Sequence, residues 1–196
     1  TGYAIVAYQT AYLKTYFPNQ YLAAFLTFES QANKASEWIP YLEDCRRTRF
    51  VDAATGLQAK VGVEVRPPDI NLSRSDFAVV FDDAEPRDAL HGHVRFGLKA
   101  LKGAGDKAIE TIIAERERGG AYGSIFEFCE RLPPGAVTKA TLEALIRCSA
   151  FDSVHGRANR AAMVATVEQA MSAGAKAAAD KAAGQGGLFG GGAAPP

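Results

Sequence analysis

The feature that most constrains the fold is a glycine turn between two apolar segments, within FGLKALKGAGDKAIETII at residues 96–113. After the turn, apolar residues recur every three or four positions, as one face of a helix requires. Glycines at such a break permit backbone conformations that a Cβ would forbid, and they let another backbone approach closely. The spacing predicts a short helix, a tight turn and an amphipathic helix, over 98–102, 103–105 and 106–118. Its apolar positions are Leu98, Leu101, Ala108, Ile109, Ile112 and Ile113.

This order of elements matches the helix-hairpin-helix pattern, and its turn has the chemistry of an anion site. The backbone N–H groups there would lie at a helix N-terminus, where unpaired donors and the helix dipole favour negative charge. A DNA phosphate fits, and contact with it would be independent of base sequence. A tight turn that only joins two packed helices would need the same glycines and stays open as an alternative. The candidate DNA-binding residues are Lys99, Lys102, Gly103, Ala104, Gly105, Asp106 and Lys107.

Three apolar helices are predicted before this motif, over 3–16, 18–29 and 34–48. The first has aromatic and aliphatic residues at helical spacing and is predicted to be buried. The second is apolar on most of its sides, so other elements must cover it. These segments predict a helical body at the beginning of the chain.

A small β layer is predicted between the helices and the glycine turn. Residues 49–60 show no sustained period and are predicted to form an insertion loop. Alternating apolar residues over 61–66, 77–81 and 94–98 then predict short strands, the first of which ends at a double proline. The β layer is therefore expected over 61–97.

A second hairpin is predicted where helical patterns over 138–149 and 157–172 follow the first hairpin. Its arginines are candidates either for further phosphate contacts or for an ordinary solvated surface: Arg147, Arg157 and Arg160. Residues 174–184 could extend the last helix, and 186–196 are predicted to be flexible. The fold class is mainly α, with a helical segment, a small β layer and a tandem helix-hairpin-helix. The predicted regions are 1–48, 49–60, 61–97, 98–172 and an Ala/Gly-rich tail over 173–196.

Composition and charge exclude several classes of protein. Hydrophobic residues make up 47% and charged residues 22% of the chain, as in ordinary globular proteins. No apolar run approaches the ~20 residues of a membrane helix, so no membrane partner is expected. Three cysteines without a C-x-x-C pair argue against a disulfide framework or a zinc finger. Residues 91–165 carry a net charge of +3, against −3 in 1–90, a small excess that is compatible with phosphate binding.

Six blocks of sequence, in their order and spacing, carry a resemblance that extends over about residues 1–190. They are YAIVAYQTAYLKTYFPNQYLAAFLT (3–27), YLEDCRR (41–47), PPDIN (67–71), RFGLKALKGAGDKAIETIIAER (95–116), SIFEFCER (124–131) and LEALIRCSAFDS (142–153). They resemble the bacterial replicative DNA polymerase III alpha subunit. The resemblance implies that residues 1–48 are distal fingers helices and that the tandem hairpins of 98–172 grip duplex DNA behind the active site.

The same resemblance implies that the catalytic palm, which holds Mg²⁺, precedes Thr1 in a longer polymerase of the bacterial cytoplasm. We therefore expect no catalytic residue, metal site or cofactor in this chain. His91 and His93 lack an acidic or cysteine partner and are predicted to be surface residues. Two departures stand out: the extra residues at 49–60, and Ser149 where relatives usually have glycine. Because serine tolerates a left-handed helix end poorly, the geometry of the second hairpin is in question.

The tail resembles the internal sliding-clamp-binding peptide of this polymerase family, in which a glutamine leads to a hydrophobic–aromatic pair. The matching residues are Gln185, Leu188 and Phe189. Burying the two apolar side chains in a pocket would contribute about 1.5–3 kcal/mol each. The expected partners are thus double-stranded DNA, a sliding clamp and the rest of the replicase.

The predicted function is a non-catalytic, DNA-handling segment of a DNA-directed DNA polymerase, a nucleotidyltransferase. Three alternatives stay open. The chain could be the equivalent segment of an error-prone paralogue, or a purely structural helical module. It could also belong to a helix-hairpin-helix repair enzyme, although a base-excision glycosylase would place a catalytic aspartate where this chain has Ile125, Phe126 and Glu127.

Overall fold

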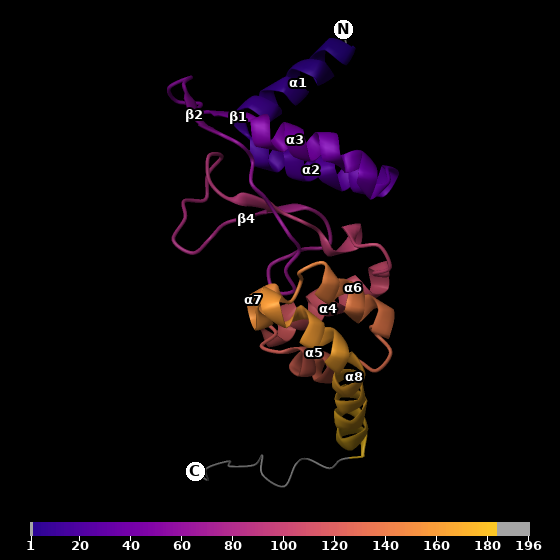
Figure 1. Cartoon of the computed structure of the whole chain (residues 1–196). Coiled ribbons are helices and arrows are strands. Elements are labelled where there is room, and N and C mark those ends of the chain that lie inside the picture. Colours follow the sequence, from indigo (N-terminus) through magenta and orange to yellow (C-terminus); the bar gives the residue numbers. More distant parts are fainter. Residues whose placement is uncertain (1, 184–196) are drawn as a thin grey trace. The chain divides into compact units, whose positions relative to one another are not determined.

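The computed structural model describes residues 2–183 (Figure 1). The chain divides into two compact units, residues 1–102 and 103–196. The boundary falls inside the glycine turn, between Lys102 and Gly103. The expected class, mainly α with a small β layer, is confirmed, whereas the division into five regions stays a prediction.

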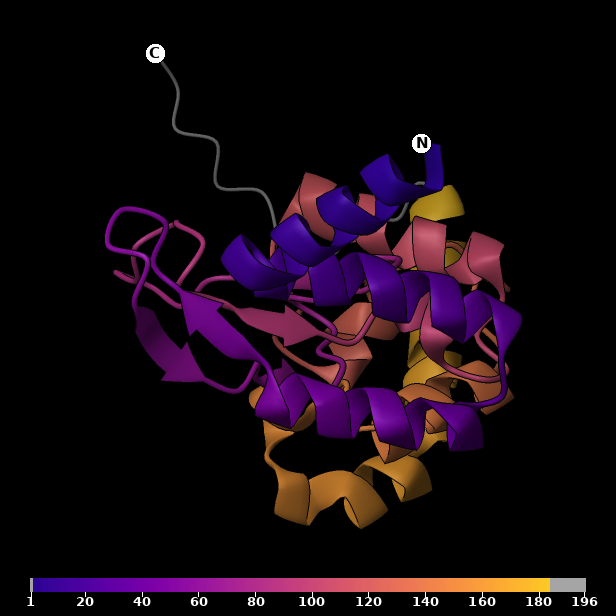
Figure 2. The ribbon, with the colours of Figure 1, turned by 90° about the horizontal axis from the view of Figure 1, so that it is seen from above.

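Unit 1 begins with helices at the predicted places. They are α1 (Gly2–Tyr16), α2 (Pro18–Ala32), the short 3-10 helix η1 (Ala35–Trp38) and α3 (Ile39–Arg47). The predicted third helix is divided because Pro40 lacks an N–H and fits only the first turn of an α-helix. α2 and α3 lie side by side, with the rings of Phe25 and Tyr41 5.0 Å apart (Figures 1 and 2).

The predicted burial of α1 is wrong. None of its residues is buried, and the side chains of Tyr3 and Tyr8 are 92% and 70% exposed. Its tyrosine rings contact one another instead of a core, with the centroids of Tyr12 and Tyr16 4.8 Å apart. Helical spacing of apolar residues defines a face of a helix but does not supply the surface that covers it.

The prediction of an insertion loop at 49–60 is also wrong. Strands β1 (Arg49–Val51) and β2 (Gln58–Val61) form an antiparallel hairpin there, which extends away from the helices (Figure 2). Phe50 is fully buried, and the ammonium of Lys60 lies 4.3 Å from the centroid of its ring. Strands of three and four residues are too short for a period of two to stand out in the sequence.

The predicted β layer is confirmed as a three-stranded sheet in the order β3-β5-β4. β3 (Val65–Arg66) runs parallel to β5 (His93–Arg95), and β4 (Ala78–Val80) runs antiparallel to it. All three residues of the central strand β5 are buried. His93, which was predicted to be a surface residue, is therefore 1% exposed. The core of unit 1 joins this sheet to α2 and α3 through Leu22, Ala23, Leu26, Cys45, Phe50, Val63, Phe77 and Val94.

The regular elements among the described residues of unit 2 are all helices. They are α4 (Asp106–Gly119), α5 (Ile125–Arg131), α6 (Lys139–Arg147), α7 (Asp152–His155), the 3-10 helix η3 (Arg157–Asn159) and α8 (Arg160–Ala182). The helices predicted over 106–118, 138–149 and 157–172 are confirmed as α4, α6 and α8, and α7 was not predicted. α8 continues through residues 173–182, so the predicted tail does not begin at 173. Alanine and lysine favour helix, which explains the extension.

The core of unit 2 is built on three aromatic rings and a close helix contact. Tyr122 and Phe151 each meet Phe128 edge to face, with centroid distances of 4.9 and 5.2 Å. On α8, a Cβ at Gly174 would lie 2.4 Å from the carbonyl oxygen of Cys129 on α5. Glycine is therefore required for the close approach of these two helices.

Candidate nucleic-acid interface

The segment before the glycine turn is one 3-10 turn, η2 (Leu98–Ala100), and not the predicted helix over 98–102. Its first two N–H groups donate to the carbonyls of Arg74 and Ser75, at 2.9 Å each. The loop that contains Arg74, Ser75 and Asp76 lies so close to this segment that a Cβ at Gly97 would be 2.4 Å from the carbonyl carbon of Asp76. The segment is therefore held by the loop of unit 1, and it ends after one turn.

The two glycines of the turn have different roles. Gly103 has a φ of 89°, in the left-handed region that favours glycine. Gly105 has a φ of −67° and a ψ of 142°, which any residue can adopt, and nothing lies within 4 Å of the site of a Cβ. The expectation that both positions need glycine is therefore wrong for Gly105.

α4 begins with an open N-terminus. Gly105 is its N-cap residue, and no side chain accepts a hydrogen bond from the first-turn N–H groups. Gly105, Asp106 and Lys107 are exposed, and Ala104 is half-buried. The first turn of a helix offers unpaired N–H groups and the positive end of the dipole, so this surface can accept an anion. Asp106, in the same turn, already supplies one negative charge.

The predicted lysines divide between the two units. Lys99 and Lys102 belong to unit 1, where Lys99 is half-buried and Lys102 is exposed. Lys107 lies on α4 in unit 2. The residues that the structure groups in one unit are therefore Gly103, Ala104, Gly105, Asp106 and Lys107.

Thr141 supports the turn and was not identified from the sequence. It lies in α6, and its hydroxyl donates to the carbonyl oxygen of Gly103 at 3.2 Å. Thr138, the N-cap residue of α6, accepts the N–H of Thr141 at 3.1 Å. The signal in the sequence is a T-x-x-T spacing at a predicted helix start, which identifies a cap but not its long-range partner.

The second turn also has a left-handed residue, although it is not glycine. Ser149 has a φ of 84°, and Ala150 donates its N–H to the carbonyl of Leu145 at 2.9 Å, as at a left-handed helix end. A guanidinium group compensates for the strain at serine. Nη2 of Arg160 donates to the Ser149 hydroxyl at 2.6 Å.

Arg160 is held within the protein by a second partner as well. Its Nε donates to Oδ1 of Asp152 at 2.7 Å, and its Nη2 donates to Oδ2 of the same carboxylate. These hydrogen bonds lower the pKa of Asp152 below its usual range. The sequence left open a phosphate contact or a solvated surface for Arg160, and the structure instead shows it bound within the protein to Asp152 and Ser149.

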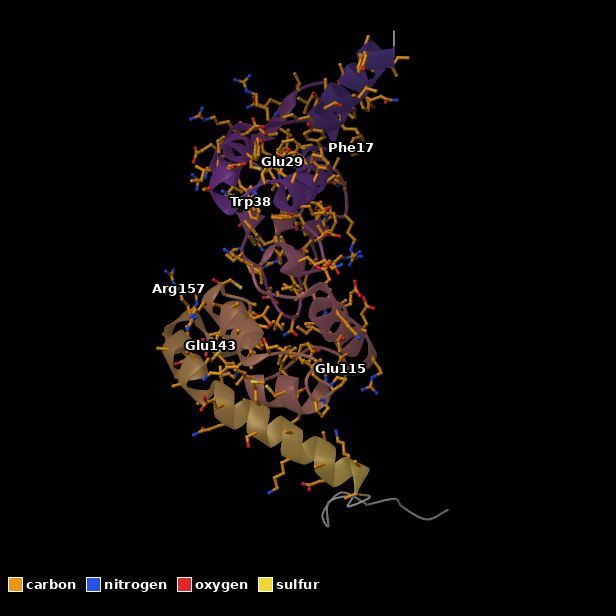
Figure 3. The ribbon with its side chains drawn as sticks, turned by 90° about the vertical axis from the view of Figure 1, so that its right-hand side faces the viewer. Phe17, Glu29, Trp38, Glu115, Glu143 and Arg157 are labelled. Carbon is orange, nitrogen blue, oxygen red and sulfur yellow. The ribbon has the colours of Figure 1, made fainter. Side chains whose placement is uncertain are left out.

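The other two arginines of the second hairpin are exposed. Nη2 of Arg147 donates to Glu143 one turn earlier on α6, at 2.8 Å. Arg157 lies at the periphery of unit 2 (Figure 3), and its side chain has no hydrogen bond or ion pair to another described residue. The clamp-like residues Gln185, Leu188 and Phe189 lie outside the described residues.

Residues 2–183 contain neither a candidate metal site nor a candidate membrane helix. No group of three or more histidine, cysteine or acidic side chains is placed to hold a metal ion. No helix in this range combines the length and apolar character needed to cross a membrane.

Comparison with known proteins gives a family and a set of relatives. The model of a helix-hairpin-helix motif matches residues 62–163. DNA polymerase III subunit alpha of Neisseria meningitidis serogroup B is 36% identical over 96% of this chain and 14% of the relative. The subunit of Haemophilus influenzae is 32% identical over the same shares, and that of Pseudomonas aeruginosa is 33% identical over 100% of this chain and 16% of the relative.

The chain thus spans about a seventh of the length of the relatives that it matches. The predicted resemblance is confirmed over nearly all of the chain. The chain belongs to the helix-hairpin-helix family and is homologous to one segment of DNA polymerase III alpha subunits.

Proposed function

We propose that this chain is a non-catalytic segment of a bacterial replicative DNA polymerase that holds duplex DNA by its phosphate backbone. The single observation that carries the proposal is the open N-terminus of α4, next to the left-handed Gly103, within the region that the helix-hairpin-helix model matches. Unpaired N–H groups and lysines there would bind phosphate without regard to base sequence.

The DNA-binding residues of this proposal are the ones that the sequence suggested. Backbone N–H groups of the turn would donate to one phosphate, and the exposed Lys102 and Lys107 would neutralise its neighbours. Arg157, exposed and without a described partner, is the arginine of the second hairpin best suited to a further phosphate contact. The internal bonds of Arg160 make that residue a positioning residue of the second turn.

The other partners of the proposed segment follow from the homology. We include a sliding clamp, bound through Gln185, Leu188 and Phe189, and the remaining parts of the replicase, in the bacterial cytoplasm. Mg²⁺ and the polymerase reaction would belong to the palm of the parent enzyme. The names of the relatives support a main replicative polymerase over an error-prone paralogue.

The proposal is tested by fluorescence anisotropy of labelled duplex DNA against the chain over a salt series. We expect the logarithm of the binding constant to fall linearly with the logarithm of salt concentration. Lys107→Gln should reduce the slope by about 1, because it removes one phosphate contact. Asp106→Asn, which removes a carboxylate from the same turn, should tighten binding. Circular dichroism serves to verify that both variants are folded.

A variant of the turn separates backbone contacts from general electrostatic attraction. Gly103→Val would force a β-branched residue into the left-handed region, so the turn would rearrange and DNA affinity would fall. Gly105→Ala is the matched control, because its backbone conformation suits alanine and its Cβ meets no atom. Equal affinity of folded Gly103→Val and unchanged protein would refute binding by the hairpin.

A further inference from the structure

A basic hollow in unit 1 is lined by residues from the end of α1, the end of α3 and the beginning of β1. Figure 1 shows these three elements next to one another. It has a volume of about 410 Å³, and its lining includes Lys14, Asp44, Arg47 and Arg49. All of these residues belong to unit 1, and none of them is part of the turn that begins unit 2.

The backbone holds both arginines at the hollow. Thr48 and Phe50, which alternate with them in sequence, are buried, with exposures of 6% and 0%. Arg47 ends α3, and Arg49 begins β1, paired in register with Val61 of β2. Because the buried residues anchor this short segment, the two guanidinium groups stay on the exposed side.

The charges of the hollow do not cancel. Nζ of Lys14 donates to Oδ2 of Asp44 at 2.6 Å, so the carboxylate already has its cation. The guanidinium groups of Arg47 and Arg49 have no hydrogen bond or ion pair to any residue from 2 to 183. Most other arginines of unit 2 and the sheet, by contrast, bind a carboxylate: Arg66, Arg118, Arg131, Arg147 and Arg160. The hollow therefore keeps two uncompensated positive charges.

Capping of α3 does not account for these arginines. A basic residue at a helix C-terminus often serves to bind the last carbonyl groups. Here Thr48 donates both its N–H and its hydroxyl to the carbonyl of Asp44, at 2.9 and 2.7 Å. The carbonyl of Cys45 accepts the N–H of Val63 at 2.8 Å. The carbonyls of Asp44 and Cys45 are thus satisfied without a guanidinium group.

We infer that this hollow binds phosphoryl oxygens through the guanidinium groups of Arg47 and Arg49. Arginine is always charged, and its planar set of donors matches the oxygens of a phosphate in pairs. The same chemistry occurs in a DNA phosphodiester and in the triphosphate of a nucleotide. The inference goes beyond the proposed hairpin contact and does not depend on it.

The test compares two double variants of equal charge in the whole chain. Arg47→Gln/Arg49→Gln removes both guanidinium groups of the hollow. Arg74→Gln/Arg87→Gln removes two exposed arginines of the same unit that do not line it. A third double variant, Arg47→Lys/Arg49→Lys, keeps the charge of the hollow. Thermal unfolding verifies that all three variants are folded.

Duplex DNA and inorganic triphosphate are the two probes, and they distinguish the sources of phosphate. If DNA is the ligand, the hollow variant should lower the slope of log affinity against log salt by about 1.8, that is, about 0.9 for each lost contact. The lysine variant should keep most of the slope. If the ligand is a free polyphosphate, triphosphate binding should fall in calorimetry while DNA binding equals that of the control variant. Either result supports the inference.

The inference is overturned if the hollow variant and the control variant bind both probes equally. A different result would refute the hairpin proposal alone. DNA binding would then be lost in the hollow variant and kept in folded Gly103→Val.

Discussion

The two turns of unit 2 share a backbone conformation and differ in what surrounds it. Gly103 and Ser149 have φ values of 89° and 84°. Nothing lies within 4 Å of a Cβ built at Gly103, and the helix N-terminus beside it is uncapped. The serine hydroxyl instead accepts a hydrogen bond from Arg160, which also binds Asp152. The first turn is open to a ligand, whereas internal polar groups fill the second.

The largest effect on this comparison is expected from Arg160→Met. The change keeps the apolar stem but removes the donor to both Ser149 and Asp152, so the free energy of unfolding should fall by about 2 kcal/mol. The salt dependence of DNA binding should not change. Urea unfolding and anisotropy measure the two quantities. Exposed Arg157→Met should show the opposite pattern, with unchanged stability and a slope lowered by about 1. A slope that drops by about 1 in Arg160→Met would show that the second turn is open as well.

The variants Gly103→Ser and Ser149→Gly place at each turn the residue of the other turn. Gly103→Ser should lower the free energy of unfolding by about 1–2 kcal/mol, because no partner within reach offsets the left-handed strain. In Ser149→Gly the relief of strain and the loss of the hydroxyl bond to Arg160 should nearly cancel, to within about 1 kcal/mol. Chemical unfolding of both variants gives the answer. Equal losses at the two positions would contradict the proposed role of the arginine.

The second turn should also make stability depend on pH. The pKa of Asp152 is lowered in the folded protein by hydrogen bonds from Arg160. The contribution of this carboxylate to stability is therefore complete above the pKa of an unfolded aspartate, about 3.9. It is lost as pH falls through the pKa of the folded state. Asp152→Asn should be less stable than the unchanged chain at neutral pH, and the difference should shrink at acidic pH. A difference that is constant with pH would exclude this carboxylate as the cause.

The smallest effect is expected at Gly105. A serine there would be an N-cap residue in an ordinary extended conformation, and it should change the free energy of unfolding by only about 0.3 kcal/mol. Its hydroxyl would nevertheless occupy N–H groups that the proposal assigns to phosphate. We expect weaker DNA binding at nearly constant stability. If affinity is unchanged, these N–H groups do not carry the contact.

Sequence patterns predicted those elements whose apolar residues recur over several turns. α4 and α6 follow from such patterns, and so does the sheet from alternating valines and phenylalanines. The hairpin of β1 and β2 was missed because its strands are short, and the burial of α1 was wrong because periodicity does not reveal a partner.

At the candidate site, local sequence identified the left-handed glycine but not the contacts that decide its use. The bonds from Thr141 to Gly103 and from Arg160 to Ser149 join residues that are 38 and 11 positions apart. A single sequence contains no signal for such pairs, because either partner could serve another purpose. The open and the filled turn could be told apart only in the structure.

The close contact at Gly174 has a mechanical consequence for the end of the chain. Because the peptide of Cys129 occupies the space of a missing side chain, α8 cannot slide or rotate on α5 without a clash. From this fixed point, α8 continues for eight residues to Ala182, or ~12 Å at the rise of an α-helix. α8 thereby acts as a rigid spacer of defined length and direction. The last residue of α8 is thus held at a set distance from the contact with α5.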